Sequence, residues 1–214
     1  MLTRAELLGQ IMRNYDTPIA VAGTHGKTTT TSMISHILLE SDCDPTISVG
    51  GILPVIGGNI RVGNSETFVT EACEYTNSFL SFFPKISLIL NIDADHLDFF
   101  KDIEDIRHSF RLFAEKLPAD GTLIINSDTD KYTEIIRDLP CEIITYGLNS
   151  NADYTAQNIQ YNEYGYATFD CVKDGVNLGT YSLSVPGIHN VSNALATLVL
   201  GFKLGLNSEA LKTG

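Results

Sequence analysis

Apolar, β-branched runs alternate with helix-patterned segments over the first two thirds of the chain. This order is typical of an α/β domain, in which helices cover a mostly parallel sheet. The expected strands are residues 18–22, 46–50, 67–72, 86–92, 121–127 and 142–147. The expected helices begin near Lys27 and near Ile103, and a short helix follows residue 127.

The pattern changes near Asp153, where aromatic and β-branched runs are separated by the turn-forming stretches "NEYG" and "KDG". Residues 152–160, 164–172 and 177–185 therefore predict a small antiparallel β meander near the C-terminal end. A closing helix is expected over residues 189–205, because its apolar positions fall on one face. These positions are Val191, Ala194, Leu195, Leu198 and Phe202.

Composition narrows the class of protein. The chain has 214 residues, 43% of them hydrophobic, and a formal net charge of −12. This charge disfavours nucleic acid as a partner, since a phosphate-binding surface needs clustered Lys and Arg. The four cysteines are far apart in the sequence, which fits a reducing cytoplasm better than a disulfide framework. No apolar stretch reaches the roughly 18 to 20 residues that span a bilayer, so we expect no membrane partner.

The stretch "AVAGTHGKTTTTSM" at residues 20–33 joins an expected strand to an expected helix. A strand, glycine loop, Lys-Thr pair and helix in this order can wrap backbone N–H groups around a phosphate, as in P-loop NTPases. Gly23 and Gly26 allow close approach, Lys27 supplies charge for the β and γ phosphates, and the Thr28 hydroxyl can bind Mg²⁺. The broad motif has a glycine where Val21 stands, and the alternative is a glycine turn whose threonines cap a helix.

Glu71 lies near the end of the expected strand 67–72, at the edge where α/β sheets present ligand-binding groups. If that strand runs beside the phosphate loop, the carboxylate can complete an Mg²⁺ shell. The alternative is a solvated strand end or a cap. Glu74 is a weaker candidate.

The stretch "NIDADHLD" gathers Asp93, Asp95, His96 and Asp98 after another apolar strand. His96 offers a neutral imidazole or a proton-transfer group, and the acids could orient it or bind cations. The alternative is that the acids cap the next helix, for which Asp102 is already a candidate N-cap.

The stretch "PGIHNVSNALA" places Asn190 and Asn193 near the start of the closing helix. Carboxamides both donate and accept hydrogen bonds, which suits the edge of a purine base. The alternative is an ordinary cap with a buried amide.

Together, "GTHGKTTTT", "EACEY", "NIDADHLD" and "PGIHNVSNALA", in this order and at these distances, resemble the central domain of the Mur ligases. The resemblance covers almost the whole chain. The phosphate loop of this family is G-T-[HN]-G-K-[ST], which accommodates Val21. The His in this loop, the E-A-x-E pattern and the D-H-L-D loop look most like the branch that joins L-alanine to UDP-N-acetylmuramate.

The resemblance implies a role for each motif. Lys27 would bind the β and γ phosphates of ATP, Thr28 and Glu71 would hold Mg²⁺, and His96 would take part in a second metal site. Lys27, Glu71 and His96 would then be the catalytic residues. The residues implied to line the ATP site are Gly23, Thr24, His25, Gly26, Lys27, Thr28, Thr29, His189, Asn190 and Asn193.

The resemblance also implies an ATP-dependent carboxylate–amine ligase that acts through an acyl phosphate in peptidoglycan precursor synthesis. Residues 1–16 are expected to lead in from an N-terminal UDP-binding domain, and residues 17–214 to form the central ATP-binding domain. The amino-acid-binding domain, which supplies a basic and an acidic group, is expected to be absent. We expect the chain alone to fold, to bind Mg·ATP weakly and to catalyse no ligation.

Sibling ligases carry a carbamylated lysine where Phe110 aligns. Here Phe110 belongs to an apolar helical stripe, so we expect a core residue and no carbamate. Three other functions stay open: a muropeptide-recycling ligase of the same family, a P-loop kinase or ATPase, and a non-catalytic nucleotide-binding module. The stripe comprises Ile103, Ile106, Phe110, Phe113 and Leu117.

Overall fold

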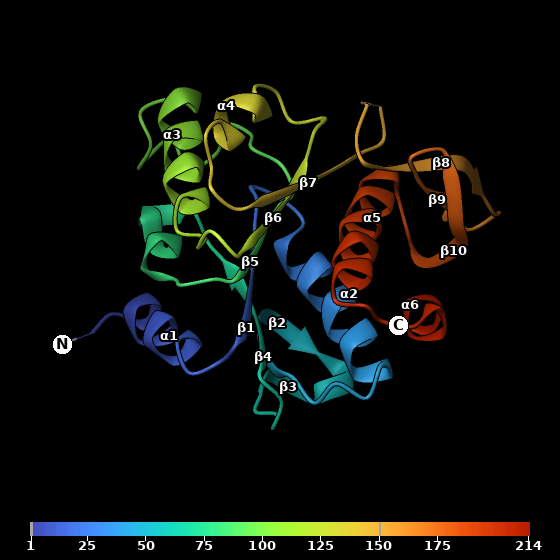
Figure 1. Cartoon of the computed structure of the whole chain (residues 1–214), viewed down its shortest axis with the longest axis horizontal. Helices are drawn as coiled ribbons and strands as arrows, with labels where there is room; N and C mark the ends of the chain where they lie inside the picture. Colours follow the sequence, from blue (N-terminus) through green and yellow to red (C-terminus); the bar gives the residue numbers. More distant parts are fainter. Residues whose placement is uncertain (1, 150) are drawn as a thin grey trace.

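The computed structural model describes residues 2–149 and 151–214. Over these residues ten strands form one sheet in the order β10-β9-β8-β7-β6-β5-β1-β4-β2-β3 (Figure 1). The strands are β1 (Thr17–Ala22), β2 (Thr46–Leu53), β3 (Gly58–Arg61), β4 (Thr67–Ala72), β5 (Ile86–Ile89), β6 (Thr122–Asn126), β7 (Glu142–Gly147), β8 (Tyr154–Tyr161), β9 (Tyr166–Lys173) and β10 (Val176–Pro186).

The sheet is parallel from β2 through β4, β1, β5, β6 and β7 to β8. Strands β9 and β10 extend it antiparallel at one end, and β3 does so at the other. The predicted α/β class and C-terminal meander are therefore confirmed. One detail differs, because β8 pairs parallel with β7 through Tyr146 and Tyr154. The meander thus continues the main sheet.

Helices cover both faces of the sheet (Figure 1). On one face lie α1 (Arg4–Met12), the 3₁₀ segment η2 (Tyr75–Ser81), α3 (Ile103–Ala114) and α4 (Tyr132–Ile136). On the other face α2 (Lys27–Glu40) packs against α5 (Ile188–Lys203) and α6 (Ser208–Thr213). The 3₁₀ turn η1 (Pro54–Ile56) joins β2 to β3. Among residues 2–149 and 151–214, no helix is both long and apolar enough to cross a bilayer.

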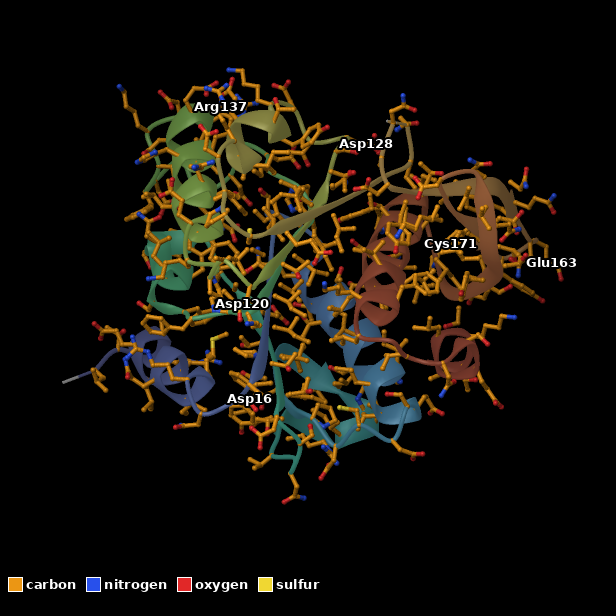
Figure 2. All side chains as sticks on the ribbon, viewed as in Figure 1. Asp16, Asp120, Asp128, Arg137, Glu163 and Cys171 are labelled. Carbon is orange, nitrogen blue, oxygen red and sulfur yellow. The ribbon has the colours of Figure 1, made fainter. Side chains whose placement is uncertain are left out.

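Each face of the sheet has its own hydrophobic core, and Figure 2 shows side chains between the sheet and the helices on each face. The first core joins α2 and α5 to the sheet. The second contains the predicted stripe of α3, in which Phe110 is fully buried and meets the ring of Phe79 edge-on at 5.4 Å between centroids. Phe110 is thus a core residue, as predicted. Asp102 caps α3 by accepting a hydrogen bond from the Asp105 N–H, also as predicted.

Candidate functional site

The phosphate-loop motif links β1 to α2 at the carboxyl edge of the sheet, and its glycines are sterically required. Gly26 has φ +86°, and a Cβ there would lie 2.7 Å from Asn193 Oδ1. Gly23 has φ +147°, and a Cβ there would lie 2.9 Å from the Leu90 Cβ. Gly26 is the N-cap of α2 and makes no side-chain capping bond. The first N–H groups of α2 are therefore available to an anion.

Hydrogen bonds connect the phosphate loop to the segment that follows β5. Asn91 accepts a hydrogen bond from the His25 N–H at 2.7 Å and donates one from Nδ2 to the His25 carbonyl at 2.9 Å. The Thr24 N–H donates to the Asn91 carbonyl, and the Asp93 N–H donates to the Thr24 hydroxyl at 2.9 Å. These bonds fix the conformation of the loop, while the His25 side chain stays exposed.

Lys27, the first residue of α2, turns its ammonium group back onto the loop. Its Nζ lies 2.5 Å from the Gly23 carbonyl and 3.1 Å from the Thr24 carbonyl. Both carboxylate oxygens of Glu74 contact the same Nζ, at 2.9 and 3.2 Å. Because the Glu74 side chain is only 2% exposed, this ion pair is largely shielded from water.

Thr28 and Glu71 meet beside the loop. The Thr28 hydroxyl donates to Glu71 Oε2 at 3.1 Å, and the Gly50 N–H donates to Glu71 Oε1 at 2.5 Å. A hydroxyl and a carboxylate are the hard oxygen ligands that Mg²⁺ prefers, so this pair fits such an ion. Thr29 is half-buried in the same turn of α2.

His96 lies next to Glu74. Its Nε2 is 3.7 Å from Glu74 Oε1, and its ring contacts that of Tyr75 at 4.7 Å between centroids. The Tyr75 hydroxyl donates to Asp98 at 2.8 Å, and this bond to a carboxylate raises the pKa of Tyr75. Within the described ranges, no three His, Cys, Asp or Glu side chains gather as a metal site. His96 therefore joins the Lys27–Glu74 pair, and no described contact joins it to Glu71.

The start of α5 reaches the loop through a chain of buried amides. Asn190 donates to the Pro186 carbonyl at 2.8 Å, and Asn193 donates to Asn190 Oδ1 at 3.1 Å. The Asn193 Oδ1 faces Gly26, because a Cβ atom added at Gly26 would lie only 2.7 Å from it. His189 is exposed at the first turn of α5. Asn190 and Asn193 thus lie together beside the phosphate loop.

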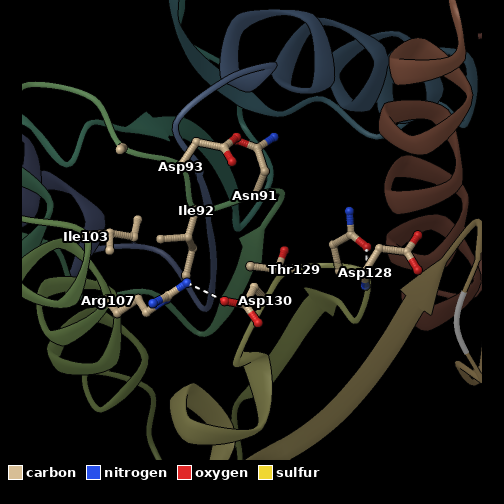
Figure 3. Close-up of a pocket in the computed structure, with 10 residues that line it drawn as sticks. Asn91, Ile92, Asp93, Ile103, Arg107, Asp128, Thr129 and Asp130 are labelled. Carbon is tan, nitrogen blue, oxygen red and sulfur yellow. Dashed lines mark hydrogen bonds and ion pairs between the residues drawn. The ribbon is translucent and has the colours of Figure 1, made fainter.

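A cavity of about 390 Å³ opens where β5 and β6 end, and Asn91 is one of the residues that line it (Figure 3). Arg107 of α3 crosses it to Asp130 at 2.7 Å, and Asp93 and Asp128 also line it. The Asp128 carboxylate accepts hydrogen bonds from the Leu148 and Asn149 N–H groups. Asp128 therefore joins the segments that follow β6 and β7.

The profile of the Mur ligase middle domain matches residues 21–201. This chain belongs to the Mur ligase family. It is 62% identical to UDP-N-acetylmuramate–L-alanine ligase from Agathobacter rectalis over 214 residues, which are 100% of this chain and 47% of that protein. The chain therefore spans about half the length of the curated relatives it matches.

Two solved structures have a similar fold. UDP-N-acetylmuramate-alanine ligase from Thermotoga maritima superposes with a TM-score of 0.80 and 28% identity, over 95% of this chain and 45% of that one. UDP-N-acetylmuramate:L-alanyl-gamma-D-glutamyl-meso-diaminopimelate ligase from Neisseria meningitides gives a TM-score of 0.86 at 24% identity, over 97% and 68%. The second likeness concerns the fold alone.

The sequence of this Mur ligase chain did not single out Asn91, and it indicated Glu74 only as a weaker candidate. Asn91 begins the "NIDADHLD" stretch, in which only the acids and His96 were candidate site residues. The available signal was a polar residue at the end of an apolar run, because that position lies at the ligand-binding edge. Glu74 was ranked below Glu71, although it is Glu74 that contacts both Lys27 and His96.

Proposed function

We propose that residues 17–214 are the nucleotide-binding domain of an ATP-dependent ligase that joins L-alanine to UDP-N-acetylmuramate. Residues 1–16 would lead in from a UDP-binding domain, and the amino-acid-binding domain would be a further part of the whole protein. The observation that carries the proposal is the convergence of three features on one loop: Lys27, the Thr28–Glu71 pair 3.1 Å apart, and Asn193 against Gly26. The 62% identity to a curated ligase of this specificity supports the choice of substrates.

In this proposal ATP is a substrate, and its triphosphate would lie over the loop. The N–H groups of Gly26, Lys27 and Thr28 would surround the β phosphate, and the ammonium of Lys27 would reach the β and γ phosphates. Asn190 and Asn193, with His189 beside them, would face the adenine. Mg²⁺ held by Thr28 and Glu71 would supply positive charge to the phosphate oxygens. His96 is the candidate ligand of a second cation.

The chemistry would activate a carboxylate that cannot by itself react with an amine. An oxygen of the lactyl carboxylate attacks the γ phosphorus, the bond to the bridging oxygen breaks, and ADP leaves with an acyl phosphate formed. The alanine nitrogen then attacks the acyl carbon, loses a proton, and expels inorganic phosphate. Lys27 and the α2 N-terminus would stabilise the negative charge that spreads over the transferring phosphoryl group.

Calorimetric titration of Mg·ADP into the chain tests the nucleotide site. Lys27→Ala should weaken binding at least about tenfold, because a desolvated contact between an ammonium and a phosphate is lost. Lys131→Ala is the matched control, since Lys131 is 42% exposed and pairs with Glu104 away from the loop. Equal affinity of the wild type and Lys27→Ala would refute the proposal.

A further inference from the structure

The positive charge of Lys27 at the phosphate loop is already offset before any ligand binds. Lys27 supplies a positive charge, and Glu74 opposes it with a carboxylate that contacts Nζ through both oxygens, at 2.9 and 3.2 Å. The Gly23 and Thr24 carbonyls take up further donors of the same ammonium. Lys27 is thus occupied from several sides by groups of this chain.

The neighbouring groups add negative charge. Glu71 accepts hydrogen bonds from Thr28 and Gly50, and no Lys or Arg of the described residues pairs with it. Asp95 and Asp98 flank His96 on the 93–98 loop. A free polyphosphate would therefore approach a loop on which the Lys27 ammonium is already paired with Glu74, in a chain of net charge −12.

We propose that Glu74 is a positioning residue that offsets the charge of Lys27, so that the loop accepts a nucleotide phosphate only together with a divalent cation. This inference rests on the proposed function. Without nucleotide, Glu74 holds the ammonium on the loop carbonyls. A cation beside Thr28 and Glu71 would supply the positive charge that draws the phosphates to the loop, where Lys27 then meets them. His96 Nε2 lies 3.7 Å from Oε1 of the same carboxylate.

The substitution Glu74→Gln separates charge from shape. The amide keeps the size of the side chain and one acceptor for Lys27, but it removes the negative charge from the site. A role limited to packing or to fixing Lys27 in a productive position predicts unchanged or weaker nucleotide binding. A counter-charge predicts the opposite, because the freed ammonium attracts the phosphates at a distance of a few ångströms.

The experiment measures ADP affinity by calorimetry, once with EDTA and once with Mg²⁺. In EDTA, Glu74→Gln should bind ADP at least about tenfold more tightly than the wild type, and in Mg²⁺ the gain should be below about threefold. Glu163→Gln is the control for net charge, since Glu163 is exposed at the outer end of the meander (Figure 2). An unchanged preference for Mg·ADP in Glu74→Gln, or weaker binding of ADP in EDTA, would overturn the inference.

A second measurement does not need nucleotide. The acetylation rate of Lys27, followed by mass spectrometry against that of Lys131, should rise at least about threefold in Glu74→Gln and in Glu74→Ala, since a shielding ion pair is removed. An unchanged rate would show that Glu74 does not restrain Lys27. Failure of the wild type to bind ADP in either buffer would refute the proposed function, and the acetylation rate would still decide the role of Glu74.

Discussion

Replacing Asn91 by Ala should loosen the phosphate loop, because the Asn91 amide holds His25 from both sides. The substitution removes the bond from the His25 N–H at 2.7 Å and the bond to the His25 carbonyl at 2.9 Å. At about 1 kcal/mol for each net hydrogen bond, the free energy of unfolding should fall by about 2 kcal/mol. For a chain of this size the melting temperature should then fall by about 4 to 8 °C.

Asn91→Ala should also weaken nucleotide binding. If the loosened loop must be ordered again by the ligand, the Kd for Mg·ADP should rise by up to about 30-fold, which is 2 kcal/mol in binding free energy. Calorimetry measures this, and urea unfolding followed by circular dichroism measures stability. Asn59→Ala on β3 is the control, since Asn59 is exposed. A stability loss of the expected size with an unchanged Kd would refute the reasoning that Asn91 orders the binding loop.

Two further predictions concern stability. Phe110→Ala should lower the free energy of unfolding by about 3 to 5 kcal/mol, because removal of a fully buried ring that packs edge-on against Phe79 leaves a cavity. Urea unfolding measures this loss. A loss of less than about 1 kcal/mol would contradict the core position of Phe110. The pKa of Asp44 is lowered to about 2, first of all by the hydrogen bond from Arg61. The ionised Asp44 therefore stabilises the folded chain above its ordinary pKa of about 3.9, and this stabilisation is lost as the pH falls toward 2. The acid side of the stability profile should therefore be flatter in Asp44→Asn between about pH 4 and pH 2, and an identical slope in both proteins would show that the Asp44–Arg61 contact does not contribute.

The class of fold could be predicted from the sequence because element type follows from local periodicity. Strand 86–92 and the helix from Ile103 are visible as a β-branched run and an apolar stripe. They correspond to β5, which ends earlier, at Ile89, and to α3. Strand order was not predictable in the same way. Pairing of β7 with β8 depends on contacts between separate segments, for which a single sequence carries no local signal.

The meeting of Thr28 and Glu71 follows from the alternation of side chains along β4. Val69 belongs to the core that contains α2, whereas Phe68 and Ala72 belong to the core on the opposite face. Glu71 lies two residues after Val69 and therefore on the same face, where the first turn of α2 begins. Parity along one strand, together with pairing of β1 and β4, thus accounts for this part of the site.

Glu74 is different, because it lies beyond the end of β4, where alternation no longer determines the direction of a side chain. The following residues Thr76 and Asn77 adopt left-handed backbone conformations, with φ of +54° and +57°, so the chain turns sharply after Glu74. The 3₁₀ segment η2 then packs against α3, and the Glu74 carboxylate that precedes it is buried in its ion pair with Lys27. A one-residue slip of β4 would turn Glu71 away from Thr28. The Lys27–Glu74 pair depends instead on this turn, so substitutions at Thr76 or Asn77 should alter the charge balance of the loop while leaving the Thr28–Glu71 pair in place.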